Sequence, residues 1–499
     1  MSEEVNTQDE LVARKDRLQD LRDMGIDPFG SSYKRTHKVS ELVNDFTVAE
    51  ESGEEAVSAL GEYCIAGRIM NQRSMGKAAF GNLLDLSGSI QFYLRKDAVS
   101  EEEFLAFKKL YVGDIIGIKG TLFKTKKNEL SLRVSQITVL SCALRPLPEK
   151  FHGLTDKELR YRKRYLDLIV NEKARNTFIT RSKLISSFRR TLDAKDYIEV
   201  ETPVLHAIPG GAAAKPFTTH HNALDMQFYM RIATELHLKR LLVGGLEKVY
   251  EIGRIFRNEG ISQRHNPEFT TIELYEAYSD FEGMMELTEE LVSNACMAAH
   301  GTLELPYNGE TLNFQRPWKR MRYLDAICEL GNISMDDLKV YEKVQAICKE
   351  RKVDVDPKMP IGKLYDALFE DVVEPTLFQP TFIYDYPKEL SPLAKEIPDQ
   401  PGMTFRFEAT VAHMEIANAF SELNDPIDQL DRFQKQVEDR EQGDDEAHHL
   451  DMDYVESLEY AMPPAGGLGI GIDRLTMLLS DNNSIREVIL FPHMKNKDQ

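Results

Sequence analysis

The sequence predicts an α+β protein in which a small β-barrel precedes a larger antiparallel sheet surrounded by helices. Five strand-like runs with one helix among them lie between residues 62 and 144. From residue 180 onward helices alternate with hairpins, and no regular strand–helix–strand repeat appears. That second pattern favours an antiparallel sheet with helices packed around it.

The chain has 499 residues, of which 42% are hydrophobic and 29% are charged. These fractions are typical of a globular protein. The formal charge of -20 argues against non-specific binding of polyanions by the whole molecule, but a local basic surface remains possible. Five widely spaced cysteines form no CxxC pair, so a zinc site or a disulfide framework is not expected. No apolar run is long enough to cross a bilayer, and the first twenty residues are charged and polar. We therefore expect a cytoplasmic protein without membrane contact.

Residues 1–61 are predicted to be a helical extension, with helices over 8–25 and 40–60. Residues 62–144 then change to strand patterns, with the predicted helix Ser100–Leu110 after the third strand. The predicted strands are Tyr63–Met70, Ala78–Leu86, Ser89–Leu94, Val112–Leu122 and Glu129–Leu140. This order is typical of an OB-fold barrel, which often stacks single-stranded bases on aromatic side chains beside cations.

The aromatic side chains of this barrel have two possible roles. They are Phe80, Phe92, Tyr93 and Phe123. Because strand faces alternate, some of them must be core and the others are candidates for base stacking.

Residues 145–180 are predicted to be a basic linker. Thirteen Lys or Arg stand against five Asp or Glu in residues 145–190, centred on Arg160–Arg164. A solvated helix face and contact with a phosphate backbone both explain this pattern.

Residues 181–499 form the predicted second domain, with a mainly helical insertion at about 320–375. At its centre, strands 249–258 and 268–278 flank a polar loop. On the second strand Ile272 and Leu274 suit a core, whereas the odd positions are mostly polar or aromatic. A face that combines cations, carboxylates and an aromatic ring suits a ligand with phosphate and a flat ring. The alternative is a solvated hairpin with surface ion pairs.

Two further stretches carry chemistry. The strand-like residues 404–425 hold several carboxylates that would be costly to bury without cationic partners, either Mg²⁺ or an ammonium group. Strict alternation puts Asn418 and Glu422 on one face and Glu415 on the other, so a common site requires a bulge between 415 and 418. Residues 465–471 contain four glycines, which suits close approach of a ligand to the backbone. Asp473 is expected to cap the next helix, and Arg474 in its first turn suggests a phosphate partner.

Three stretches together resemble the signature motifs of class II aminoacyl-tRNA synthetases. The helix from about Thr177 to Lys195, the strand after it and Pro203 resemble motif one, the dimer element. The hairpin with FRNEG resembles motif two, and GLGIGIDRL at Gly467–Leu475 resembles motif three. The class I signatures HIGH and KMSKS are absent. An OB barrel ahead of a class II synthetase-type sheet is similar to the subgroup for lysine, aspartate and asparagine.

Within that subgroup the chain resembles the bacterial-type lysyl-tRNA synthetases over nearly its full length. The matching segments are Met75–Phe80, Arg145–Leu154, Arg164–Leu168, Pro209–Phe217, Thr219–Asp225, Glu235–Gly245 and Phe420–Asp425. The resemblance implies that lysine and ATP form lysyl-adenylate, after which lysine passes to the 3′ end of tRNA(Lys). It also implies Mg²⁺ and a homodimer.

The resemblance implies site residues as well. The residues implied for the reacting phosphates are Arg257, His265 and Arg474. Those implied for adenine are Glu259 and Phe269, and those implied for the metal are Glu408 and Glu415. The residues implied to bind substrate lysine are Gly211, Glu235, Arg257, Glu273, Tyr275, Asn418 and Glu422. Of these, Glu422 and Tyr275 are implied to face its ε-ammonium. The residues implied to read the anticodon are Phe80, Gln91 and Glu129.

Some positions depart from the family pattern, and some rival functions stay open. Lys215, His413-Met414, Ala419 and Ala465 stand where other residues are usual. A relative that lysylates a protein would lack the barrel. An aspartyl or asparaginyl enzyme would want a cation where Glu422 stands, and a non-catalytic nucleic-acid-binding relative would not need its acids and arginines.

Overall fold

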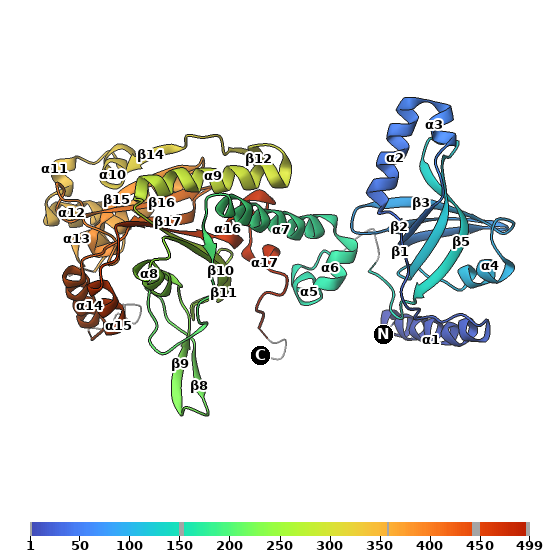
Figure 1. Ribbon diagram of the computed structural model, residues 1–499, viewed down its shortest axis with the longest axis horizontal. Helices are drawn as coiled ribbons and strands as arrows, with labels where there is room; N and C mark the ends of the chain where they lie inside the picture. The colour runs from blue at the N-terminus through green and yellow to red at the C-terminus, as the bar shows by residue number, and fades with distance from the viewer. Residues whose placement is uncertain (1, 149–153, 357–358, 442–449, 496–499) are drawn as a thin grey trace. The chain divides into compact units, whose positions relative to one another are not determined.

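The computed structural model describes residues 2–148, 154–356, 359–441 and 450–495 (Figure 1). It divides into two compact units, Met1–Gly153 and Leu154–Gln499, each with its own hydrophobic core.

The first unit contains a closed five-stranded barrel with the neighbour order β1-β2-β3-β5-β4. Its strands are β1 (Tyr63–Met75), β2 (Ala78–Leu84), β3 (Ser89–Arg95), β4 (Ile115–Lys124) and β5 (Leu130–Ser141), with helix α4 (Glu101–Lys108) between β3 and β4. Along β3 the alternate residues Ile90, Phe92 and Leu94 are buried, because successive side chains point to opposite faces of a strand. The predicted OB-fold barrel is confirmed.

Three N-terminal helices pack onto this barrel: α1 (Ser2–Asp23), α2 (Val39–Ser52) and α3 (Glu54–Ser58). The single helix predicted over 40–60 is broken at Gly53, whose φ of 110° does not fit a helix. Leu21, Leu42 and Phe46 belong to the same core as the barrel strands. The extension therefore shares the barrel's stability.

The second unit is built on a sheet with the strand order β14-β15-β16-β17-β18-β11-β10-β6. These strands are β6 (Ile198–Glu199), β10 (Lys248–Phe256), β11 (Glu268–Ala277), β14 (Lys319–Arg322), β15 (Thr381–Pro387), β16 (Met403–Val411), β17 (Met414–Ser421) and β18 (Ala465–Gly471). The central pairs are antiparallel as predicted, but β6 and β14 pair in parallel with their neighbours. The sheet is therefore mixed, because long connections return the chain in the same direction at both edges.

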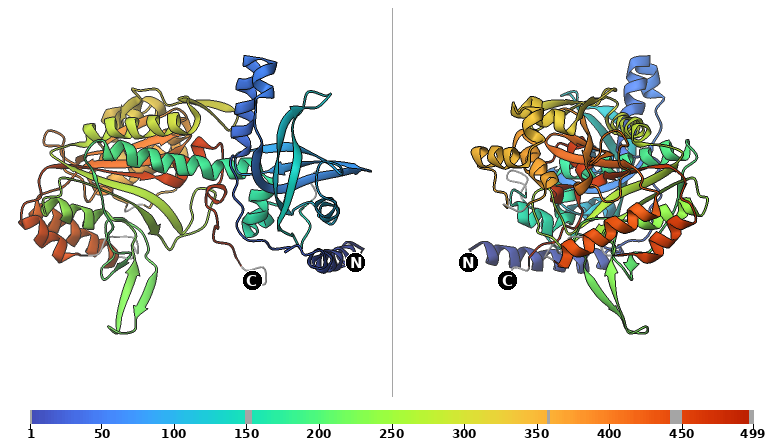
Figure 2. Two further views of the ribbon diagram at one scale, coloured as in Figure 1. Left: turned by 45° about the vertical axis from the view of Figure 1, so that its right-hand side comes forward. Right: turned by 90° about the vertical axis from the view of Figure 1, so that its left-hand side faces the viewer.

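Helices α7 (Glu172–Asp193), α9 (Phe281–His300) and α16 (Ile472–Leu479) cover one face of this sheet (Figures 1 and 2). Ile272, Leu274 and Ile470 lie in the core beneath them, each fully buried. The period of two then turns the odd residues of β11 to the opposite face. That polar face carries the predicted site.

Smaller elements complete the second unit. They are α5 (Lys157–Arg162), α6 (Arg164–Val170), β7 (Leu205–His206), β8 (Thr218–His221), β9 (Met226–Met230), α8 (Glu235–Val243), β12 (Glu304–Tyr307), β13 (Glu310–Asn313), α10 (Tyr323–Gly331), α11 (Met335–Leu338), α12 (Tyr341–Arg351), α13 (Ile361–Val372), α14 (Pro426–Glu441), α15 (Met452–Glu459) and α17 (Ile485–Val488). Helices α10–α13 lie between β14 and β15 in sequence and have a separate core. The β8–β9 hairpin projects away from the sheet (Figures 1 and 2).

The basic cluster Arg160–Arg164 is largely occupied by contacts within the protein. Arg164 is fully buried, binds Asp167 at 2.6 Å and donates to the carbonyl of Leu490. Arg160 pairs with Asp167 and with Glu487. Neither a solvated face nor a phosphate contact describes these two arginines, which instead hold the start of the second unit to its C-terminal segment.

A buried ion pair anchors α1 to the barrel unit. Asp114, fully buried, accepts from Arg17 at 2.5 and 2.8 Å and from the backbone N–H groups of Tyr111 and Ala143. We predict that Asp114→Asn destabilises the first unit by about 3–5 kcal/mol, because it leaves Arg17 buried without its counter-ion. Native-state hydrogen exchange of the barrel strands measures this loss.

The fluorescence of the single tryptophan, Trp318, reports the second unit and should be unchanged. Asp97→Asn is the matched control, because Asp97 pairs with Arg95 on the exposed surface. Equal protection of the barrel strands in both variants would contradict the prediction.

Candidate functional site

The hairpin of β10 and β11 is present as predicted, with Ile255 opposite Phe269 and Glu251 opposite Glu273. Arg257 follows β10, and its guanidinium lies 5.3 Å above the ring of Phe269. Its Nε is buried and has no hydrogen-bond partner among the described residues. The structure therefore brings together a flat ring and an unused cationic donor, the two groups predicted for adenine and for the α-phosphate.

A second cationic group lies at the far end of the hairpin loop. Arg474 donates to His265 Nε2 at 3.4 Å and to a carboxylate oxygen of Glu415 at 3.1 Å. Burial and the neighbouring Arg474 lower the pKa of His265, which keeps the ring neutral at pH 7. Glu259, predicted to face adenine, is exposed in the loop.

Asp473 does not cap the helix that follows β18, so that expectation is wrong. The N-cap is Gly471, and Asp473 lies inside the first turn. Its carboxylate accepts from Arg181 at 2.5 Å and from the backbone N–H of Thr270 at 2.6 Å. It therefore joins α16 to α7 and to the hairpin.

The bulge required on β17 is present. Ala409 pairs with Ala417 and Thr410 pairs with Glu415, so Ile416 is the extra residue. The bulge turns Glu415 onto the face that carries Asn418, which pairs with Glu408 across the strands. The carboxylates predicted to share one site therefore do share a face.

Glu408 and Glu415 are candidates for a metal. Burial and the nearby carboxylate of Glu415 raise the pKa of Glu408 to about 7. Arg406, which donates to Glu408 at 2.5 Å and to Asn418 at 3.1 Å, acts in the opposite direction. Two neighbouring carboxylates on one face suit a hard divalent cation. No cluster of three or more His, Cys, Asp or Glu suited to a metal occurs in the described ranges, so phosphate oxygens would have to complete such a site.

The predicted lysine pocket contains an ammonium that belongs to the chain itself. Lys239 on α8 is fully buried and lies between Glu235, at 2.6 Å, and Glu422, with which it forms a close ion pair. Burial raises the pKa of Glu422 to about 8, whereas Lys239 lowers it. The second oxygen of Glu422, Oε1, is buried without a hydrogen-bond partner in the described structure. This unpartnered buried acceptor suits a cationic ligand.

Three other residues are predicted to bind substrate lysine: Glu273, Tyr275 and Gly211. Glu273 accepts from the backbone N–H and the hydroxyl of Thr234 at 3.1 and 2.7 Å, and burial raises its pKa to about 7. The ring of Tyr275 is buried, and Lys239 lies 6.0 Å from its centre. Gly211 has a φ of 86°, a conformation that other residues rarely adopt, and a side chain there would meet Glu235.

The barrel brings three of its four candidate aromatics to the surface. Phe80 lies 4.6 Å from Tyr93, and Tyr93 lies 6.0 Å from Phe123, with all three half-buried. Phe92 is the core member, fully buried against Phe107. The half-buried rings form a surface on which bases can stack.

The other two predicted anticodon residues lie on the same barrel. The side-chain oxygen of Gln91 accepts from Ser131 at 2.8 Å, and Glu129 is exposed just before β5.

Sequence reasoning missed two cations, the buried Lys239 and the half-buried Arg406. Lys239 stands four residues after Glu235 on a helix, a spacing that puts both on one face. Arg406 precedes Glu408 by two residues on a strand, which also places them on one face. Both spacings are visible in the sequence. The contacts are completed by Glu422, which is distant from Lys239 in the chain, and by the amide oxygen of Asn418 on the strand next to Arg406.

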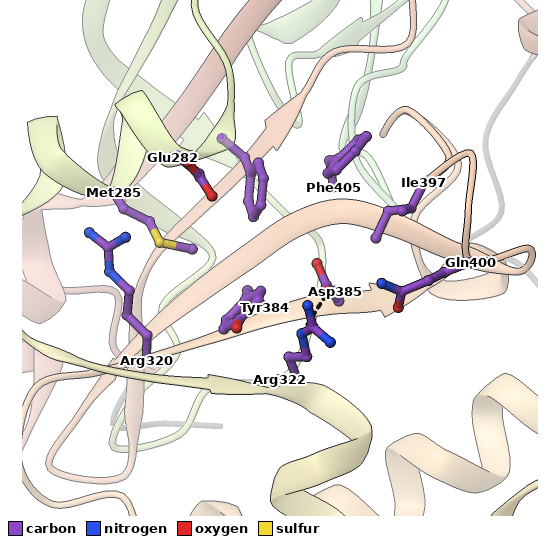
Figure 3. Close-up of a pocket in the computed structure, with 10 residues that line it drawn as sticks. Glu282, Met285, Arg320, Arg322, Tyr384, Asp385, Ile397, Gln400 and Phe405 are labelled. Carbon is purple, nitrogen blue, oxygen red and sulfur yellow. Dashed lines mark ion pairs between the residues drawn. The ribbon is translucent and has the colours of Figure 1, made fainter.

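A separate cavity of about 250 Å³ lies at the β14 end of the sheet (Figure 3). Phe281, Tyr384 and Phe405 form its apolar part, and Arg322 pairs with the buried Asp385 at 3.4 Å. None of the predicted site residues lines it.

The chain was compared with known proteins. Residues 156–495 match the family model for class II tRNA synthetases of the D, K and N group, and residues 63–140 match the OB-fold nucleic-acid-binding anticodon domain. The chain therefore belongs to the class II synthetases, in the group for aspartate, lysine and asparagine. Within it, the chain is 53% identical to proteins named lysine–tRNA ligase from Staphylococcus aureus strains MRSA252, Mu3 and N315, over 499 residues and the whole of both chains. No described helix is long and apolar enough to span a membrane.

The glycine strand β18 passes close to Glu422 and Tyr275 of the predicted lysine pocket. A Cβ at Gly467 would overlap Glu422 Oε1 and the Tyr275 ring, whereas at Gly469 the nearest atom would be 3.8 Å away. We predict that Gly467→Ala destabilises the second unit by about 1–3 kcal/mol through overpacking. Thermal unfolding followed by Trp318 fluorescence measures the change, with Gly469→Ala as the matched control. Similar melting temperatures for the two variants would contradict this prediction.

Proposed function

We propose that this chain activates L-lysine with ATP at the polar face of its central sheet and transfers the lysyl group to tRNA(Lys), with the residues named below. The buried and unpartnered Oε1 of Glu422 supports this most directly, because such an acceptor requires a cationic side chain to complete it. The family and the near-complete match to lysine–tRNA ligases agree with that chemistry.

Adenylate formation is a displacement at the α-phosphate of ATP. The carboxylate of lysine is already ionised, so the attack needs no general base. The chain has to hold the two reactants in line and stabilise negative charge on the phosphate oxygens. Arg257 is suited to both tasks, because its free Nε and its position over Phe269 put a cation beside the expected adenine ring. Pyrophosphate is the leaving group.

The outer phosphates fit the other cationic end of the site. Arg474 and His265 are within 3.4 Å of each other, and the neutral ring can donate through one nitrogen once phosphate replaces the arginine contact. Glu408 and Glu415 would hold Mg²⁺, which supplies positive charge against the phosphates. Glu259, exposed in the hairpin loop, is assigned to the adenine amino group.

Lysine recognition rests on complementary charge. Glu422 and Tyr275 receive the ε-ammonium, Glu235 and the carbonyl of Gly211 receive the α-ammonium, and Asn418 contacts the carboxylate. Glu273, held by Thr234, adds negative charge beneath the substrate. Arg257 links the substrate carboxylate to the α-phosphate.

The partners follow from the same assignments. Phe80 and Gln91, with Glu129, would read the tRNA(Lys) anticodon on the barrel. The edge strand β6 before Pro203 carries exposed Ile198 and suits pairing with a second copy, so we propose a homodimer. A cytoplasmic location fits an enzyme that supplies translation. The barrel disfavours a protein-lysylating role, and the anionic pocket disfavours aspartate.

We predict that Glu422→Gln weakens lysine activation by about 2–5 kcal/mol in kcat/KM, because the substrate ammonium loses its charged partner. ATP–pyrophosphate exchange at graded lysine measures this, and the KM for ATP should stay within about twofold. Glu276→Gln, which disturbs the Lys248 ion pair outside the site, is the control. An unchanged KM for lysine in Glu422→Gln would contradict the assignment of Glu422 to the substrate ammonium.

A second prediction concerns the barrel. Phe80→Ala should raise the KM for tRNA(Lys) by about tenfold or more, since one stacked base contributes about 1–3 kcal/mol. The ATP–pyrophosphate exchange rate without tRNA should not change. Phe29→Ala, which removes an exposed phenyl ring from the same unit, is the control. Equal charging kinetics for the two variants would remove Phe80 from the anticodon surface.

A further inference from the structure

Lys239 sits inside the lysine pocket without a role in the reaction described so far. Its side chain is fully buried on α8, and its Nζ contacts Glu235 Oε1 at 2.6 Å and forms an ion pair with Glu422 Oε2. Glu422 Oε1 remains unpartnered among the described residues. One carboxylate therefore has one oxygen occupied by an internal ammonium and one oxygen free.

The charges around Lys239 come from several elements. Glu235 shares its helix, Glu273 and Tyr275 come from β11, Glu422 follows β17, and Tyr454 belongs to α15. Arg406 acts on Glu235 from further away and is itself engaged with Glu408 and Asn418.

Against the three carboxylates in this group, the pocket holds one ammonium. Acids therefore outnumber ammonium groups in this pocket, which suits a substrate that carries ammonium groups.

We propose that Lys239 is a positioning residue for substrate choice: it occupies Glu422 Oε2 and leaves only Oε1 to the substrate, so that the pocket accepts an ammonium and rejects a guanidinium. This inference rests on the proposed role of Glu422. A guanidinium binds a carboxylate best through two parallel N–H donors, which need both oxygens. An ammonium is satisfied by one oxygen and other acceptors nearby. Arginine, the other long cationic amino acid, therefore loses its preferred contact.

Lys239 also favours the ionised form of Glu422. Burial raises the pKa of Glu422 to about 8, and the Lys239 ammonium opposes that rise. The carboxylate form binds the substrate, so lysine binding weakens as the pH falls through this pKa. Without Lys239 the pKa rises further, and the loss of binding moves to higher pH.

The test is ATP–pyrophosphate exchange by the full chain carrying Lys239→Met, with lysine and with arginine over pH 6–9. The ratio of kcat/KM for lysine to that for arginine should fall by about tenfold or more. The midpoint of the lysine kcat/KM profile should move up by about one pH unit. If Lys239 had only a structural role, its loss would lower kcat/KM for lysine and for arginine by the same factor and leave the midpoint unchanged.

Lys248→Met is the matched control, because it breaks another lysine–glutamate pair in the same unit outside the pocket. Should Lys239→Met fail to fold, Lys239→Gln removes the same charge while retaining a donor, and the same two readouts apply. An unchanged ratio with an unchanged midpoint in the folded variant overturns the inference. Glu422→Gln distinguishes failure of this inference from failure of the proposed function. If Glu422→Gln leaves lysine activation intact, the proposed role of Glu422 is wrong.

Discussion

The compensation of buried carboxylates by cations is the constraint on which the second unit depends. Its sheet puts apolar residues beneath α7, α9 and α16, and the alternation of strand side chains then places acids on the opposite face. Glu408 and Glu422, together with Glu235 on α8, can stay in this region only beside Lys239, Arg406 or a bound cationic ligand. The site and the stability of the sheet therefore rest on the same charges.

The predicted substrate site contains buried polar atoms whose hydrogen-bonding capacity is not used within the described chain. Glu422 Oε1 and Arg257 Nε are buried without hydrogen-bond partners in the described structure. An unpartnered buried group costs free energy that a bound ligand of opposite polarity recovers. One acceptor and one donor left open in this way suit a substrate that brings both an ammonium and a carboxylate.

Backbone irregularities make this arrangement possible. The bulge at Ile416 turns Glu415 onto the face of Asn418, and the absent side chain of Gly467 leaves room for Glu422 and Tyr275. Neither feature adds a ligand contact of its own. Each corrects a regular strand so that side chains from separate segments converge on one site.

The sequence by itself determined the five-stranded barrel, the hairpin and the need for a bulge, because each depends on local periodicity and residue type. Motif resemblance supplied the site residues. Only the tertiary structure decided that Arg160 and Arg164 are buried ion-pair partners, that Asp473 braces α7 rather than capping α16, and that the sheet edges are parallel. Lys239 between Glu235 and Glu422 was equally hidden, because the partners are 183 residues apart (239 to 422) and nothing local fixes which distant acid a buried cation will meet.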